Sequence, residues 1–194
     1  KLIVCRYFFT RKLLFASQAA AVVLFPGGFG TQDECFEILT LIQTGKSPIV
    51  PVVMVDAPPG KGSDDYWGRW DRYVRDELLA NGWISPEDLN LYHVTTDVND
   101  AVQHVRRFYR NYHSQRVVRD TFVMRIRTPV TTPQLDALKD EFSPLVAEGR
   151  IQQGDALPQE TEHLHLPRLY WVSTRRDYGL LRQMIDRVNE MAPA

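Results

Sequence analysis

The segment PGGFGTQDE occupies residues 26–34 and stands between two regions of different hydrophobic pattern. The five residues before it, 21–25, are all apolar, as expected for a strand covered on both faces in a parallel sheet. From Thr31 within the segment to residue 44, apolar side chains recur at helical spacing, and Gly45 is suited to ending a helix. The segment therefore predicts a glycine-rich turn that leads from a buried strand into a helix.

A turn of this kind can bind a phosphate group. A helix N-terminus presents backbone N–H groups without intrahelical acceptors and the positive end of the helix dipole. Gly27, Gly28 and Gly30 allow a close backbone approach, and Thr31 adds a hydroxyl group. In a purely structural interpretation, Thr31 and Glu34 form a capping box that satisfies each other's backbone donors. Spacing alone leaves both interpretations open, because the sequence has neither the dinucleotide-binding pattern GxGxxG nor the phosphate-loop pattern GxxxxGK[ST].

Strand-like and helix-like segments alternate over residues 1–115, which we expect to form one domain. The alternation predicts an α/β fold with a Rossmann-like parallel sheet and helices on both faces. Strands are expected at residues 2–7, 21–25, 49–55 and 91–94, and helices at 11–20, 31–44, 65–79 and 97–112, with a further helix start at 85–88.

A different pattern begins near residue 117, and we expect a small α+β unit over residues 116–194. Apolar and basic residues alternate at 122–127, which is typical of a half-exposed strand. A helix from 132 to about 148, a strand at 164–172 and a helix at 177–191 are expected to complete the unit.

Composition excludes several function classes. The net charge of -1 gives no reason to expect a nucleic-acid partner. Cys5 and Cys35 lack a metal-binding spacing, and two cysteines without a disulfide framework favour a reducing, cytoplasmic location. No apolar run approaches the roughly 20 residues that a membrane span needs. Because Lys1 leads directly into an apolar run, we expect an upstream part of the domain to precede it.

The segment PGGFGTQDE, with Arg11 and Lys12 upstream, resembles the PGGxGTxxE and RK signature of the LOG family. Every fixed position of the nine-residue motif is matched, and the similarity extends through residues 39–45 to about Tyr112. LOG proteins are Rossmann-like nucleotide phosphoribohydrolases, many of them formerly described as lysine decarboxylases. The resemblance is to the longer bacterial type. It implies that the N-terminal half of the domain is missing from residues 1–115.

The resemblance implies an enzyme that hydrolyses the N-glycosidic bond of a nucleoside 5′-monophosphate, AMP or a cytokinin riboside monophosphate, to free base and ribose 5-phosphate. It assigns Arg11 and Glu34 as the catalytic pair. A carboxylate can stabilise an oxocarbenium-like state at the ribose and orient the attacking water. Arg11 could hold phosphate or offset charge on the departing base, and both roles stay open. The expected phosphate cradle comprises Gly27, Gly28, Phe29, Gly30 and Thr31.

Three neighbouring charged residues have alternative assignments. Lys12 could assist with phosphate, and Asp33 and Glu37 could polarise Glu34 or contact ribose hydroxyls. Acidic residues in a first helical turn are also favoured simply by the helix dipole. The resemblance further implies a homo-oligomer, at least a dimer, and neither a metal nor another cofactor.

Two other function classes compete with hydrolysis. A non-catalytic nucleotide sensor or carrier could use the same fold, because fold does not determine function. Decarboxylation of an amino acid would need a Schiff-base lysine for pyridoxal phosphate, and no lysine stands in a recognisable context for one.

Three other side-chain groups have mainly structural interpretations. His163 and His165 could bind a metal with Glu160 or Glu162, but a strand edge is favoured. A basic patch in the second unit is better interpreted as a solvated face. A base pocket or subunit contact built from aromatic residues is disfavoured against core packing. The patch would comprise Arg125, Arg127, Arg168, Arg175 and Arg176, and the aromatic set Trp67, Trp70, Tyr73 and Trp83.

Overall fold

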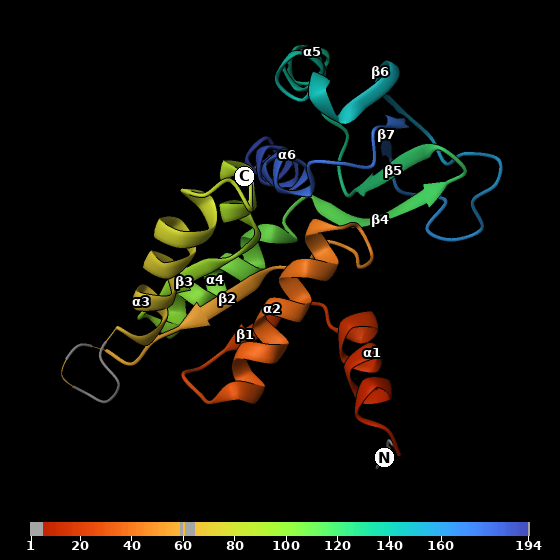
Figure 1. Ribbon diagram of the computed structural model, residues 1–194. Coiled ribbons are helices and arrows are strands. Elements are labelled where there is room, and N and C mark those ends of the chain that lie inside the picture. The colour runs from red at the N-terminus through yellow and green to blue at the C-terminus, as the bar shows by residue number, and fades with distance from the viewer. Residues whose placement is uncertain (1–5, 59, 61–64, 194) are drawn as a thin grey trace. The chain divides into compact units, whose positions relative to one another are not determined.

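The computed structural model describes residues 6–58, 60 and 65–193 (Figure 1). The chain forms two compact units. The first contains Lys1–Ser85 and Leu91–Ala101, and the second contains Pro86–Asn90 and Val102–Ala194. Within the described ranges, every helix is too short or too polar to cross a membrane.

The first unit is built on three parallel strands in the order β1-β2-β3: β1 (Val22–Leu24), β2 (Val52–Val55) and β3 (His93–Thr95). All four residues of β2 are buried, because this strand lies in the middle of the sheet. The parallel strands predicted within 21–25 and 49–55 are confirmed, and the strand expected at 91–94 is found at His93–Thr95, because Leu91 still belongs to a 3₁₀-helix. The strand predicted at 2–7 falls largely outside the described residues.

Helices follow the strands of this unit as the alternation predicts (Figure 1). Gly45 has a φ of 67° just beyond the second helix, the left-handed conformation in which glycine ends helices. The helix expected at 65–79 changes from α to π geometry at Val74. The helical segments are α1 (Phe8–Gln18), α2 (Phe29–Gln43), α3 (Tyr66–Tyr73), the π-helix Val74–Leu79 and α4 (Val98–Phe108), which continues into the second unit. Between the π-helix and β3 lies the 3₁₀-helix Pro86–Leu91, of which Pro86–Asn90 belong to the second unit.

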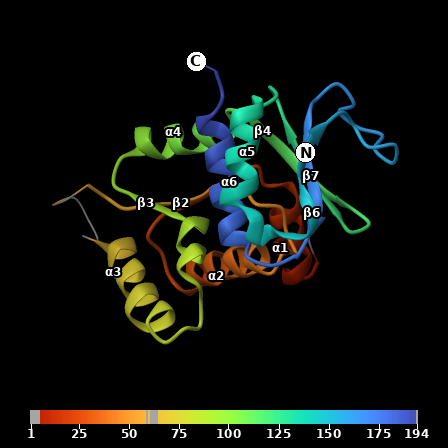
Figure 2. The same ribbon diagram turned by 90° about the horizontal axis from the view of Figure 1, so that it is seen from above.

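The second unit contains a four-stranded antiparallel sheet in the order β4-β5-β7-β6. Figure 2 shows its two helices, α5 and α6, on the same side of this sheet. The α6 helix buries Leu181, Met184, Ile185 and Val188. The elements are β4 (Tyr112–Val118), β5 (Thr121–Ile126), α5 (Thr132–Glu141), the 3₁₀-turn Ser143–Leu145, β6 (Val146–Gly154), β7 (Arg168–Ser173) and α6 (Tyr178–Glu190). The α+β character predicted for this part of the chain is confirmed.

Three boundaries predicted in the second half of the chain are wrong. The strand expected from residue 164 begins at Arg168, because residues 164–167 belong to the loop before it. The helix expected to reach residue 148 ends at Glu141, because Ser143 and Pro144 form a tight turn that leads into β6. The helix expected to reach residue 112 ends at Phe108. The Asn189 side chain accepts hydrogen bonds from the backbone N–H groups of Asn111 and Tyr112, at 2.7 and 2.8 Å, where β4 begins.

Candidate active site

The glycine turn is held by contacts within the motif. Gly28 is the N-cap of α2, and its carbonyl accepts hydrogen bonds from the N–H groups of Thr31 and Gln32, at 3.0 and 3.2 Å. A Cβ at Gly27 would overlap Thr31 Oγ1, so this position requires glycine. At Gly28 and Gly30, a Cβ would meet no described atom within 4 Å. Glycine at these two positions therefore leaves open space beside the N-terminus of α2.

The capping-box interpretation of this turn is wrong. The helix begins at Phe29, which places Thr31 inside its first turn and not at the N-cap. No side chain caps this helix end. The backbone of Gly28 makes the capping contacts instead, because its extended conformation points the carbonyl into the first turn. Glu34 is therefore not tied to the helix N-terminus.

Arg11 in α1 and Glu34 in α2 form an ion pair. Arg11 Nη2 lies 3.5 Å from Glu34 Oε1, and the two side chains are 52% and 31% exposed. Glu34 Oε1 itself is buried and accepts no hydrogen bond within the described part of the chain. At 3.5 Å the contact is at the outer limit of hydrogen-bonding distance, which leaves this oxygen able to accept from a water or a hydroxyl group.

Lys12 bridges two of the acidic residues around Glu34. Its Nζ lies 2.6 Å from Asp33 Oδ2 and 2.9 Å from Glu37 Oε2. Hydrogen bonds to Asp33 and then Glu37 raise the pKa of Lys12 above its ordinary value. Lys12 is therefore held as a cation, a state unsuited to forming a Schiff base.

Two clefts share the Arg11–Glu34 pair. One has a volume of 570 Å³ and is lined by the pair, by Gly30 and Thr31 of the glycine turn, and by residues 23–26 at the end of β1 and just after it. The other has a volume of 440 Å³ and adds Lys12 and Glu37 to the pair within an otherwise apolar lining. The fold thus brings the predicted catalytic pair and part of the predicted cradle to one cleft. Phe29 lines neither cleft and is 95% exposed.

One residue that contacts the turn, Tyr66, was not identified by the sequence patterns. The Tyr66 hydroxyl, at the start of α3, donates a hydrogen bond of 2.6 Å to Gly27 O and accepts one of 2.6 Å from Gln32 Nε2. Tyr66 lies 34 residues from Gln32 along the chain. The aromatic set was expected to pack in the core, and this is confirmed for Trp67 and Trp70, which are 0% and 8% exposed.

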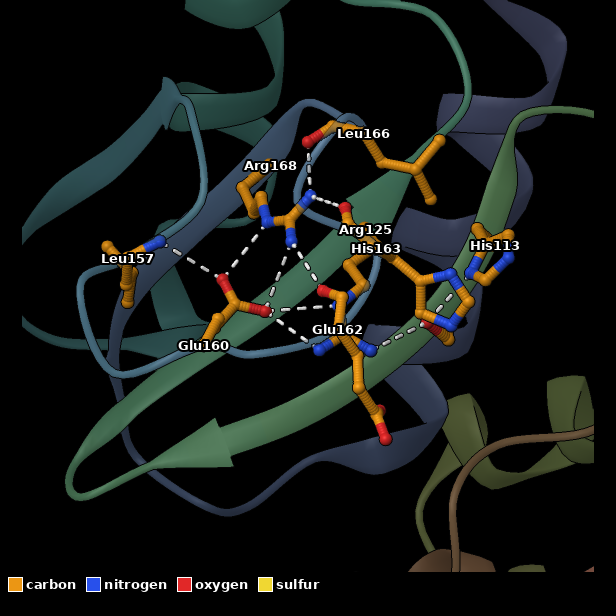
Figure 3. Close-up of polar contacts among 9 residues, drawn as sticks. His113, Arg125, Leu157, Glu160, Glu162, His163, Leu166 and Arg168 are labelled. Atoms are coloured by element: carbon orange, nitrogen blue, oxygen red, sulfur yellow. Dashed lines mark hydrogen bonds and ion pairs between the residues drawn. The ribbon is translucent and has the colours of Figure 1, made fainter.

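The second unit contains a buried ionic cluster, and the structure around it corrects three predictions (Figure 3). Glu160 accepts from Arg125 Nη2 at 2.8 Å and from Arg168 Nε at 3.0 Å. Arg125 and Arg168 therefore do not belong to a solvated face, and β5 is not half-exposed. Residues 160–165 form a loop that precedes β7, not a strand edge, because Arg168 binds the carbonyls of Glu162 and His163.

The histidines near this cluster do not assemble a metal centre. The His113 and His163 ring centroids are 4.5 Å apart, and those of His163 and His165 are 6.5 Å apart. Among the described residues, no three His, Cys, Asp or Glu side chains are placed to hold a metal ion.

The comparisons with known proteins concern this same first part of the chain. Residues 1–105 match the family model described as "Possible lysine decarboxylase". Over 105 residues the chain is 32% identical to a protein from Mycobacterium tuberculosis described as "Cytokinin riboside 5'-monophosphate phosphoribohydrolase". The alignment covers 53% of this chain and 51% of the relative, so the chain spans about half of the relative's length. With its glycine turn and Arg11–Glu34 pair inside the matched region, the chain belongs to the LOG family.

Proposed function

We propose that this protein hydrolyses the N-glycosidic bond of a nucleoside 5′-monophosphate, AMP or a cytokinin riboside monophosphate, to free base and ribose 5-phosphate. The observation that carries the proposal is the shared cleft, in which the Arg11–Glu34 pair lies beside Gly30 and Thr31 of the glycine turn. The name of the mycobacterial relative is consistent with this substrate class. The parallel sheet and its helices would form the Rossmann-like core of residues 1–115.

The glycine turn is proposed to bind the 5′-phosphate. The first N–H groups of α2 are available for an anion, and the helix dipole favours negative charge at this end. Gly27, Gly28 and Gly30 let the phosphate approach the backbone closely, and the Thr31 hydroxyl can donate a further hydrogen bond. Phe29 is placed in this cradle through its backbone N–H, since its side chain points to solvent.

Glu34 is proposed to act on the sugar. Water forms the new C1′–O bond while the C1′–N bond breaks and its electron pair leaves with the base. The base takes up the proton that the attacking water loses. The Glu34 carboxylate stabilises the positive charge that develops on the ribose ring, and it accepts a hydrogen bond from the attacking water. Oε1, which lies 3.5 Å from Arg11 Nη2 and accepts no hydrogen bond within the described part of the chain, is the oxygen suited to that contact.

Arg11 and Lys12 are proposed to supply positive charge. Arg11 remains protonated, so it acts by hydrogen bonding to phosphate or to the departing base and not by proton transfer. Lys12 holds the side chains of Asp33 and Glu37, which flank Glu34 in the sequence, through ion pairs. Glu37 also lines one of the two clefts, where its carboxylate can contact a ribose hydroxyl. We also propose that the active protein is a cytoplasmic homo-oligomer.

The direct test is incubation of the purified protein with AMP and with other nucleoside monophosphates, followed by chromatography for free base and ribose 5-phosphate. Equimolar release of the two products supports the proposal. Saturable binding of nucleotide without release of base would favour a sensor or carrier. Absence of base release from every nucleoside monophosphate tested, by folded protein, would exclude the hydrolase.

A further inference from the structure

We propose that Tyr66 is a positioning residue for the phosphate cradle, an inference that rests on the function proposed above. The tyrosine hydroxyl has one hydrogen, and it gives this hydrogen to Gly27 O at 2.6 Å. Its lone pairs then accept from Gln32 Nε2, also at 2.6 Å. The glycine turn is therefore tied to the first residue of α3 by two hydrogen bonds with defined directions.

The contact determines where the turn's N–H groups point. A trans peptide is planar, with its C=O and N–H groups directed to opposite sides. Holding Gly27 O on Tyr66 therefore directs the N–H of Gly28 away from Tyr66. In the next peptide, Gly28 O is held by the N–H groups of Thr31 and Gln32, which fixes the direction of the Phe29 N–H in the same way. Two successive donors are thus oriented before any anion binds.

Fixing the turn before the ligand binds matters most for glycine residues, because they have the greatest backbone freedom. Fixing the backbone of a residue costs conformational free energy, and glycine loses more freedom than any other residue. A turn that is ordered in the free protein does not incur this cost when the phosphate binds. The Tyr66 bridge therefore favours tight binding of the phosphate-bearing ligand.

Tyr66 is itself held by the core of the first unit. Asp56 follows β2 and is 5% exposed, and its Oδ2 accepts from the N–H groups of Trp67 and Gly68 at 2.8 and 3.3 Å. The fully buried Trp67 ring packs edge-on against the Tyr66 ring, with centroids 4.9 Å apart. The end of β2 thus anchors the residue that orients the turn after β1.

The same geometry assigns Tyr66 a positioning role and not a catalytic one. Its hydroxyl is already engaged by Gly27 and Gln32, and Tyr66 lines neither of the two clefts that contain Glu34. Removing the hydroxyl should weaken the binding of ligands that carry phosphate. It should leave the chemistry at the ribose nearly unchanged.

The test compares Tyr66→Phe with the wild type and with Tyr73→Phe, a control on the same helix whose side chain is 49% exposed. Calorimetry with inorganic phosphate and with ribose 5-phosphate measures cradle binding without turnover. The loss of one or two hydrogen bonds predicts affinities lower by about five- to twentyfold in Tyr66→Phe, and unchanged in Tyr73→Phe. The KM for AMP should rise by a similar factor while kcat changes less than about twofold.

The Gln32→Leu variant tests the bridge from its other end. It should weaken phosphate binding, and the double variant should bind phosphate no more weakly than Tyr66→Phe alone, because the two side chains act as one unit. Wild-type phosphate affinity in Tyr66→Phe would overturn the proposal, as would a fall in kcat at constant KM.

Failure of the proposed function would give a different result. Wild-type protein that binds phosphate but releases no base would remove the hydrolase proposal, while a weaker phosphate affinity of Tyr66→Phe would still support the positioning role. Wild-type protein that binds neither phosphate nor ribose 5-phosphate would overturn both.

Discussion

Arg11 Nη2 in α1 lies 3.5 Å from Glu34 Oε1 in α2, in a contact where both side chains remain partly exposed to solvent. An ion pair with this exposure contributes about 0–1 kcal/mol to folding. Stability alone therefore gives little reason for the contact. Its position in both clefts is consistent with the catalytic role that we propose for it.

Arg11→Ala should consequently separate activity from stability. We expect kcat/KM for AMP to fall at least about tenfold, because a charged hydrogen bond to the reacting ligand contributes roughly 1.5–3 kcal/mol. The melting temperature should change by only a few degrees. Steady-state kinetics and calorimetry on the same preparation measure both quantities. A variant that lost activity only in proportion to its folded fraction would contradict the assignment.

Alanine substitutions at two glycines of the turn should have different effects on stability. Gly27→Ala introduces a Cβ that overlaps Thr31 Oγ1, so we expect a loss of about 1–3 kcal/mol in stability together with weaker phosphate binding. Gly30→Ala has room for its Cβ and should not destabilise α2, but the methyl group enters the cleft and should weaken phosphate binding. Denaturant unfolding and phosphate titration distinguish the two. Unaltered phosphate affinity in Gly30→Ala would argue against the cradle.

The ionic cluster of the second unit predicts a large effect on stability. Glu160→Gln would leave Arg125 and Arg168, which are 4% and 0% exposed, without a countercharge. Breaking a buried pair in this way costs about 3–5 kcal/mol. Glu162→Gln is the matched control, because its side chain is exposed and only its backbone carbonyl binds Arg168. Equal unfolding midpoints for the two variants would contradict the structural role of Glu160.

The same unit should lose stability as the pH falls. Burial, followed by the charges of His163, Arg127, Arg125 and His165, lowers the pKa of His113 below its ordinary value. The unfolded chain therefore takes up a proton first, and stability declines as the pH falls below the ordinary histidine pKa of about 6.5.

Glu160 adds a second decline at lower pH. Burial alone would raise the pKa of Glu160, but hydrogen bonds from Arg168 and Arg125 lower it below its ordinary value of 4.5. Its contribution to stability is present above that pKa and is lost as the pH falls through the lower folded value. Hydrogen exchange at Leu157, whose N–H donates to Glu160 at 3.1 Å, reports both steps locally. Replacing His113 with Asn should remove only the decline near pH 6.5, and an unchanged profile would contradict its assignment.

The sequence predicted the elements whose patterns are local. The central strand β2 is a continuous apolar run because it is buried on both faces. The α2 helix begins at the glycine turn that the PGGFGTQDE segment predicts. The partners Arg11 and Glu34 came from the family resemblance, and the structure brings them together.

The remaining features depend on contacts between distant residues. The strand β4 has the polar sequence YHSQRVV, and its start is set by Asn189, 77 residues after Tyr112. Arg125 and Glu160 are 35 residues apart, and charged side chains are rarely buried unless paired, so sequence pattern favours a solvated face. Tyr66 reaches the turn across 39 residues, and no local pattern identifies such a hydroxyl contact.

The most direct test of the central claim is the rate of base release from AMP by the Glu34→Gln variant. The exposed Glu77→Gln is the control, since it removes one carboxylate from the same unit away from both clefts. We predict that Glu34→Gln lowers kcat by at least about 100-fold, as expected for loss of a general base or charge stabiliser, while it still binds AMP and ribose 5-phosphate. Wild-type turnover by Glu34→Gln would contradict the account.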